Sequence, residues 1–129
     1  MRTITLDEFH TELKAQGVKP HEHLAFRCPI CGTLQSGRDL IKAGAGKTWK
    51  DVEKYAGFSC VGRWTNAGPH KKGNQPGRGC NWTLGGLLRI HVLEVVTPDG
   101  EHHPCFELAT PEEAQIHMVA HEGQEATGA

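Results

Sequence analysis

FRCPICG at residues 26–32 opens the stretch that decides the fold, which returns as FSCVGRW at residues 58–64 and ends as GCNWT at residues 79–83. The first two of its four cysteines have the Cys-x-x-Cys spacing, which lets two thiolates bind one metal ion from a single tight turn. The glycine after the second cysteine can take a positive φ, which lets the turn direct its amide groups toward the sulfurs. We therefore predict a Cys₄ zinc site, formed by Cys28, Cys31, Cys60 and Cys80.

The second pair of predicted ligands does not have the Cys-x-x-Cys spacing, because Cys60 and Cys80 lie 20 residues apart. His70 lies midway between them and is an alternative fourth ligand. A zinc ion with four cysteine ligands has no open position for water, so we expect a structural metal. The sequence also shows no nucleophile–base pair or carboxylate dyad, and we expect no enzymatic activity.

The order Cys-Pro-x-Cys-Gly, Gly-Phe-Ser-Cys and Gly-Cys-Asn-Trp-Thr resembles the Cys₄ zinc ribbons at the C-terminus of bacterial type IA topoisomerases. This chain departs from them by a helical insertion before Phe58 and by a longer basic loop between the last two cysteines. The resemblance implies a zinc-ribbon fold and binding of single-stranded DNA by Phe58, Trp64 and Trp82. The rest of the chain is similar to small proteins encoded by bacteriophages and prophages.

The residues around the second pair of cysteines independently favour nucleic-acid binding. Base stacking on an aromatic ring contributes roughly 1–3 kcal/mol per base, and cationic side chains follow the phosphate backbone. The alternative is that the tryptophans cover a thin core and the cations offset the thiolate charge. The predicted interface consists of Arg63, Trp64, His70, Lys71, Lys72, Arg78 and Trp82.

Charge is divided unevenly along the chain, although the net charge is only −1. Residues 1–89 carry all 14 Lys and Arg against 7 acids, whereas residues 90–129 carry 8 acids and no Lys or Arg. Such asymmetry indicates a basic surface suited to phosphates and an acidic part that screens it, aids solubility or meets another partner. The alternative function is therefore a phage-type interaction protein that inhibits a host enzyme or defence complex, in the manner of anti-restriction or anti-CRISPR proteins, through the acidic C-terminal part.

The fold class we predict is α+β, in one zinc-stabilised domain with a small zinc-ribbon core. A Thr-x-x-Glu capping box predicts an N-terminal helix over 6–16, followed by a linker to residue 23. The ribbon spans 24–96, and a C-terminal β-hairpin with an acidic helix spans 97–122, before a frayed tail at 123–129. Within these segments we expect helices at 37–43, 49–55 and 111–121, and strands at 24–26, 58–64, 80–84, 89–96 and 104–108.

The sequence features that report on cellular location predict an intracellular protein. The sequence has no secretory signal and no apolar run long enough for a membrane span, and five cysteines fit a reducing compartment. We expect the cytoplasm of a bacterial host cell. The segment at 44–48 is a poor P-loop, because Ile41 stands where the motif needs a glycine.

The histidines and the cysteine outside the predicted zinc site are not expected to bind metal or to act in catalysis. His117 and His121 share one helical face that can bind metal, but Met118 stands where a zincin has glutamate, and we expect both to be solvated. The pair at 102–103 is expected to be an ordinary turn. Cys105 has no nearby basic group to lower its pKa, so we do not expect a catalytic thiolate.

Overall fold

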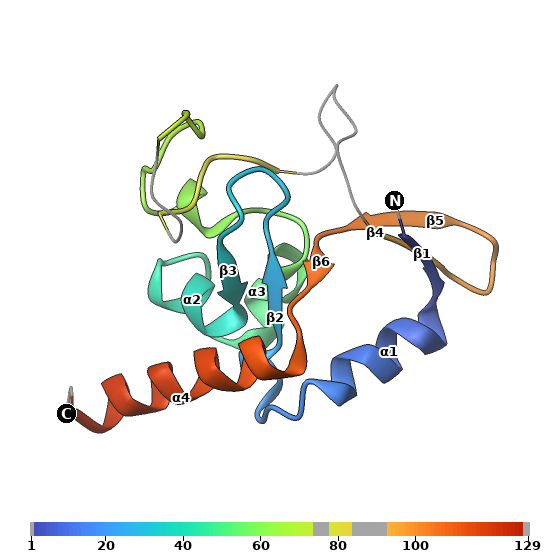
Figure 1. Ribbon diagram of the computed structural model, residues 1–129, viewed down its shortest axis with the longest axis horizontal. Helices are drawn as coiled ribbons and strands as arrows, with labels where there is room; N and C mark the ends of the chain where they lie inside the picture. Colours follow the sequence, from blue (N-terminus) through green and yellow to red (C-terminus); the bar gives the residue numbers. More distant parts are fainter. Residues whose placement is uncertain (1, 74–77, 84–92, 128–129) are drawn as a thin grey trace.

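The computed structural model describes residues 2–73, 78–83 and 93–127 of the chain (Figure 1). Within these ranges are two three-stranded sheets, ordered β1-β4-β5 and β3-β2-β6. Helix α1 contacts the first sheet, and α2 contacts both α3 and β3. The small α+β fold is confirmed. In chain order the elements are β1 (Arg2–Thr5), α1 (Leu6–Ala15), η1 (His21–His23), β2 (Ala25–Arg27), β3 (Leu34–Ser36), α2 (Gly37–Lys42), α3 (Trp49–Ala56), η2 (Val61–Arg63), β4 (Leu93–Val96), β5 (His102–Cys105), β6 (Glu107–Leu108) and α4 (Pro111–Thr127).

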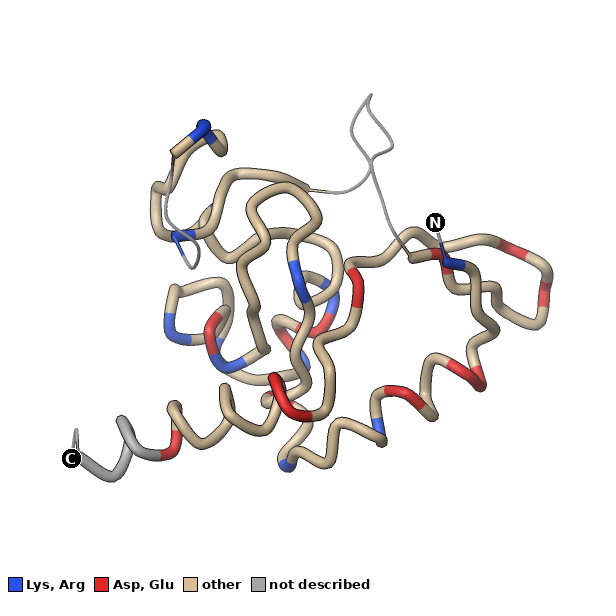
Figure 2. The backbone as a smooth tube through the Cα atoms, in the orientation of Figure 1, with Lys and Arg blue, Asp and Glu red and all other residues tan. Residues whose placement is uncertain are grey.

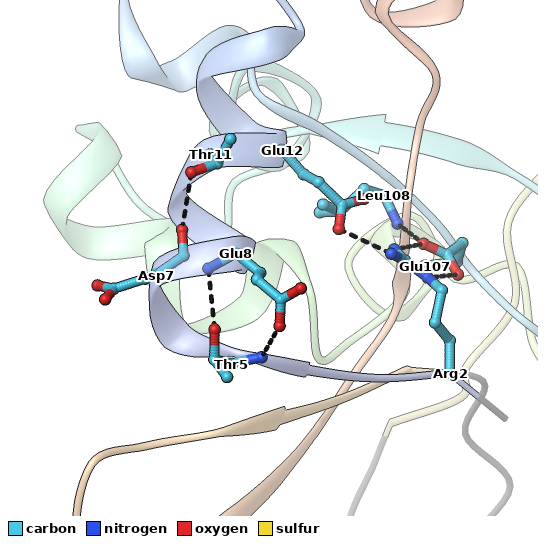
Figure 3. Close-up of polar contacts among 8 residues, drawn as sticks. All are labelled: Arg2, Thr5, Asp7, Glu8, Thr11, Glu12, Glu107 and Leu108. Carbon is cyan, nitrogen blue, oxygen red and sulfur yellow. Dashed lines mark hydrogen bonds and ion pairs between the residues drawn. The ribbon is translucent and has the colours of Figure 1, made fainter.

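Capping boxes fix where the first three helices begin. At α1 the Thr5 hydroxyl accepts a hydrogen bond from the Glu8 amide at 3.1 Å, and the Glu8 carboxylate accepts one from the Thr5 amide at 3.0 Å (Figure 3). Thr48 and Asp51 form the same reciprocal pair at α3, and a third box begins α2. Because these signals are local, the helices predicted at 6–16, 37–43 and 49–55 are confirmed.

The N-terminal residues form a strand that the sequence analysis missed. Strand β1 lies parallel to β4, with Arg2 opposite Leu93 and Thr5 opposite Val96. Arg2 also bridges two acids, with one guanidinium nitrogen 2.7 Å from Glu12 and another 2.6 Å from Glu107 (Figure 3). Arg2 is thereby joined to Glu107, which lies 105 residues further along the chain.

The C-terminal hairpin differs from its prediction in one respect. Strand β4 pairs antiparallel with β5, but the strand expected at 104–108 is divided between the two sheets. Phe106 separates β5 from β6, because its buried ring enters the core and its amide donates to the Gly57 carbonyl at 2.8 Å. Residues 89–92 of the strand expected at 89–96 lie outside the described residues.

The strands expected at 58–64 and 80–84 are mostly wrong. A single antiparallel bridge joins Ser59 to Thr83, and the chain then turns into the short helix η2. The reason is a close backbone crossing, since a β-carbon on Gly62 would lie 2.4 Å from the Cys80 amide nitrogen. Residue 84 lies outside the described residues. The second half of the site is therefore a packed turn and not a regular hairpin.

Helix α4 is longer than expected, because it continues through Gly123 to Thr127. The prediction that the helix ends before Gly123 is wrong. A single glycine costs a helix only about 1 kcal/mol relative to alanine, and good helix formers flank this one. None of the helices in the described ranges combines the length and apolar character that crossing a lipid bilayer requires.

The uneven charge distribution is partly neutralised within the fold. Figure 2 shows acids along α1 and the β4–β5 hairpin, with Lys and Arg near α2, α3 and the loop after η2. Arg27 forms an ion pair with Glu113 of α4, and Arg2 pairs with Glu107. Two acids of the segment 90–129 thus form ion pairs with arginines of the segment 1–89.

The main core is built around the cysteines. Cys28, Cys60 and Cys80 are buried in contact with a set of apolar side chains that comes from β2, from the two middle helices α2 and α3, and from the residue between β5 and β6. This set consists of Phe26, Leu40, Val52, Ala56 and Phe106. Smaller apolar clusters lie beneath α4 and within the first sheet.

One buried side chain, Gln35, holds the two halves of this core together. Its amide nitrogen donates to the carbonyls of Ala56 at 2.9 Å and Ser59 at 2.8 Å, and its oxygen accepts from the Val61 amide at 2.7 Å. These three side-chain hydrogen bonds therefore go to residues on both sides of Cys60. Strand β3 is fixed to α3 and η2 through this one residue.

We predict that Gln35→Glu destabilises the protein by about 3 kcal/mol or more, because a buried charge would face two carbonyl oxygens. The substitution preserves size, so the loss would come from hydrogen bonding and charge. Urea unfolding would measure it, with Asn66→Asp as the control, because it makes the same amide-to-carboxylate change at an exposed position. Equal stability of the two variants would contradict this role for Gln35.

Candidate metal centre

The four predicted cysteines meet at one point in the structure. Their sulfur atoms all lie within 4.8 Å of one another, and all five cysteines of the chain are free thiols. Cys28 Sγ lies 3.8 Å from Cys80 Sγ, and Cys31 Sγ lies 3.7 Å from Cys60 Sγ. Four converging sulfurs are a ligand set for a soft or borderline metal ion. His70 is exposed and lies outside this group.

The first pair of sulfurs comes from the turn between β2 and β3. The Cys28 amide donates to the Thr33 carbonyl at 3.0 Å, and the Gly32 amide donates to the Cys28 carbonyl at 2.9 Å. Gly32 has a φ of 73°, as the sequence predicted. This tight turn places Cys28 and Cys31 on one side of the site.

The second pair is brought in by the crossing at Gly62. The Cys60 amide donates to the Trp82 carbonyl at 3.0 Å, and the Cys80 amide donates to the Cys60 sulfur at 3.2 Å. Thr33 connects the two halves, because its hydroxyl accepts from the Gly79 amide and from the Cys31 thiol, each at 3.1 Å. Polar contacts through Thr33 thus hold the two pairs of cysteines near each other.

The pKa values of the clustered cysteines are shifted in opposite directions by their surroundings. The hydrogen bond from Cys28 lowers the pKa of Cys60 to about 5, and the backbone amides of Gly62 and Cys80 act in the same direction. Burial raises the pKa of Cys80 to about 12. The thiolate is the metal-binding form of cysteine, so hydrogen bonds that lower the pKa of Cys60 favour the form that can bind a metal ion.

The fifth cysteine lies apart from the group of four. Burial raises the pKa of Cys105 to about 12, with the Glu107 charge acting in the same direction. A thiol that stays protonated is a poor nucleophile, which agrees with the expectation that Cys105 is not catalytic.

The residues predicted to bind nucleic acid divide into two groups. His70, Lys71 and Lys72 are exposed in the loop after η2. Arg63 and Arg78 are exposed as well, although each donates to a backbone carbonyl, of Asn81 and Ala67 respectively.

The tryptophans are partly buried. Trp82 packs against the cysteine core, and its indole nitrogen is buried without a hydrogen-bond partner among the described residues. Trp64 also contacts that core, and its ring lies 4.9 Å from the Tyr55 ring. Both therefore serve packing to a degree, which was the alternative left open by the sequence.

A pocket of about 400 Å³ adjoins these residues. Its walls include three aromatic rings, of Tyr55, Phe58 and Trp64, and two cations, Lys54 and Arg63. The hydroxyl-bearing Ser59 and Thr83 complete the lining, and none of these described lining residues is acidic. Lys54 and Tyr55 were not singled out in the sequence, since nothing in the pattern of α3 distinguishes them from an ordinary exposed helix face.

A second group of polar side chains joins α2 to α4. His117 Nε2 lies 2.5 Å from one carboxylate oxygen of Asp39, and His121 Nε2 lies 2.8 Å from the other. The hydrogen bond to Asp39 raises the pKa of His117. Burial opposes ionisation of Asp39, but the histidines outweigh it and the pKa of that carboxyl is lowered. The expectation that both histidines are solvated is wrong, because His121 is only 7% exposed.

We predict that Cys60→Ser abolishes metal binding and the near-ultraviolet circular dichroism of the folded core, because it removes a buried ligand. Elemental analysis would measure the bound metal per chain. Cys105→Ala is the control and is expected to retain the metal. Full metal content in Cys60→Ser would contradict the assignment of this site.

Two of the three comparisons with known proteins found nothing, since no curated protein and no solved structure matches the chain. The scan against protein-family models matched residues 5–109 to the family described as VVA0879-like. This range contains all four clustered cysteines and every described strand except the first three residues of β1, and it ends just before α4. Because the match covers most of the sequence, the chain belongs to the VVA0879-like family.

Proposed function

We propose that this protein is a non-catalytic, zinc-stabilised module that binds nucleic acid, most favourably single-stranded or distorted DNA. The observation that carries the proposal is the aromatic and basic pocket of Lys54, Tyr55, Phe58, Arg63 and Trp64 beside the cysteine cluster.

Zinc is the ion that best suits the cluster. Four sulfurs at about 2.3 Å from a central Zn²⁺ would lie about 3.8 Å from one another in a tetrahedron. The Cys31–Cys60 and Cys28–Cys80 sulfur–sulfur distances, 3.7 and 3.8 Å, agree with that spacing. Such an ion would have no open coordination position, which supports a structural role and a protein without catalytic zinc.

The pocket offers the two kinds of contact that a single strand needs. The Phe58 side chain that lines the pocket is 36% exposed. The rings of Tyr55 and Trp64, which are tilted relative to each other, line the same pocket. A nucleobase can stack on such rings whatever its sequence, while Lys54 and Arg63 lie where phosphates would pass. Its volume of about 400 Å³ falls in the range of small-ligand sites.

The loop after η2 extends this surface. It begins directly after Trp64 and carries His70, Lys71 and Lys72, all exposed. Arg78 follows at its far end. Trp82 is the least suited of the predicted contacts to stacking, because it packs on the cysteine core.

We predict that Phe58→Ala weakens binding of a fluorescent single-stranded oligonucleotide by roughly fivefold to a hundredfold, because it removes one stacking contact. Fluorescence anisotropy at several salt concentrations would measure the affinity. Changing Lys71 and Lys72 to Glu should weaken binding further and lower the salt slope by about 0.7 for each lost phosphate contact.

The control for these variants is the double change of Lys14 and Lys19 to Glu, since both are exposed but lie on α1 and the following linker. It preserves the change in net charge while leaving the pocket intact. If the wild-type protein shows no salt-dependent affinity for DNA or RNA, or if all variants bind equally, the proposal is refuted. An RNA oligonucleotide of the same sequence would establish which nucleic acid is preferred.

A second candidate function, inhibition of a host enzyme or defence complex, is favoured by one observation on α4. Ile116 is 72% exposed and Val119 is 60% exposed, and residues three apart share a helix face. Glu112 and Glu122 are exposed on the same helix. An apolar pair on an acidic helix suits a protein partner with a basic-rimmed apolar groove.

We predict that changing Ile116 and Val119 to Ser abolishes capture of such a partner from nuclease-treated lysate of the source organism while leaving the fold unchanged. Deleting the acidic C-terminal part is unsuitable here, because Phe106 belongs to the main core. The control is Glu112→Ser on the same helix. A bound protein that survives the double substitution would show that this face is not the docking surface.

A further inference from the structure

We propose that Asp39, His117 and His121 form a second divalent-cation site, which takes Zn²⁺ or another borderline first-row ion through two nitrogens and one oxygen. The site lies between α2 and α4 and shares no residue with the cysteine cluster. It goes beyond the proposed function, which requires only the structural zinc.

The three side chains already converge. Their ligand atoms lie within 4.8 Å of one another, and both histidines reach Asp39 through Nε2. Imidazole nitrogen and carboxylate oxygen bind zinc at about 2.0–2.2 Å, so ligands of one tetrahedral ion would lie about 3.3 Å apart. A small outward rotation of the two imidazoles would reach that spacing.

The helix geometry makes the site possible. His117 and His121 are four residues apart on α4, so they project from the same face over one turn. Asp39 lies in the first turn of α2, where the Ser36 amide donates to its carboxylate at 2.8 Å. A ligating carboxylate that is itself hydrogen-bonded in this way is held in orientation.

A metal ion would replace protons that now hold the group together. Each short contact between a histidine nitrogen and an Asp39 oxygen requires a proton between the two atoms. One divalent cation bound to all three groups would take the place of these protons, each of which would move to Nδ1 of the same ring or to solvent.

A neighbouring histidine supplies the independent observation. His23 of η1 is only 3% exposed, and its Nδ1 has no hydrogen-bond partner among the described residues. Its ring centre lies 6.3 Å from that of His121. A buried polar atom without a partner calls for an explanation. An ion with its water ligands at this place would provide that partner.

The site would differ in kind from the cysteine cluster. Three protein ligands leave at least one coordination position for water or for an oxygen of a bound molecule. Asp39 and His117 are only partly buried, with side-chain exposures of 22% and 24%, so an ion could enter from solvent. Both histidines lie outside the residues matched by the family model, so the site would belong to this chain's C-terminal helix.

Zinc stoichiometry tests the proposal. Protein that already carries one zinc in its cysteine cluster would be dialysed against buffered free Zn²⁺ up to about 100 μM and analysed for metal. We expect two zinc ions per chain in the wild type and one in the double variant of His117→Ala and His121→Ala. The control variant, His10→Ala with His102→Ala, removes two exposed histidines elsewhere and should keep both ions.

A second measurement on the unmodified protein guards against misfolding of the variant. Long-range ¹H–¹⁵N spectra should show the Nε2 resonances of His117 and His121 shifting together as the second equivalent of Zn²⁺ binds. A wild-type protein that stops at one zinc, a second zinc retained by the double variant, or unmoved histidine resonances would each overturn the proposal.

Discussion

Four sulfur atoms from three separate turns meet within 4.8 Å, and the rest of the structure depends on that convergence. The cysteines are themselves core residues, in contact with Phe26, Leu40 and Phe106. With only 37% apolar residues and 16 glycines, the chain has little other material for a large apolar core. A bound metal would therefore replace apolar burial as the main source of stability, as it does in other small metal-dependent domains.

Buried amide side chains supply the next level of order. Gln35 connects β3 to the residues on either side of Cys60. Gln16, just after α1, connects the start of β2 to the residue after β6. The Gln16 amide nitrogen donates to the carbonyls of Ala25 and Ala109, while its oxygen accepts from the Ala25 amide. Because each glutamine satisfies backbone groups on two elements, both specify one arrangement of neighbours in a way that apolar contacts do not.

Features that depend on near neighbours were predictable from the sequence, and features that depend on distant partners were not. The turn with Cys28 and Cys31 and the capped helices follow from spacing over a few residues, whereas Cys60 and Cys80 were added to the site because of the resemblance to zinc ribbons. The division of the hairpin at Phe106 could not be foreseen, because it depends on a hydrogen bond to Gly57. The spacing of His117 and His121 did indicate a shared face, but no local signal pointed to Asp39, which lies 78 residues from His117.

The parallel pairing of β1 with β4 has a consequence for how the chain is made. Residues 2–5 leave the ribosome early, yet the strand they pair with ends at Val96. Until then their backbone groups have no sheet to join, while the cysteine turns and the capped helices can form from nearer residues. The first sheet can therefore close only after Val96 has been synthesised, later than the turns and helices that form from nearer residues.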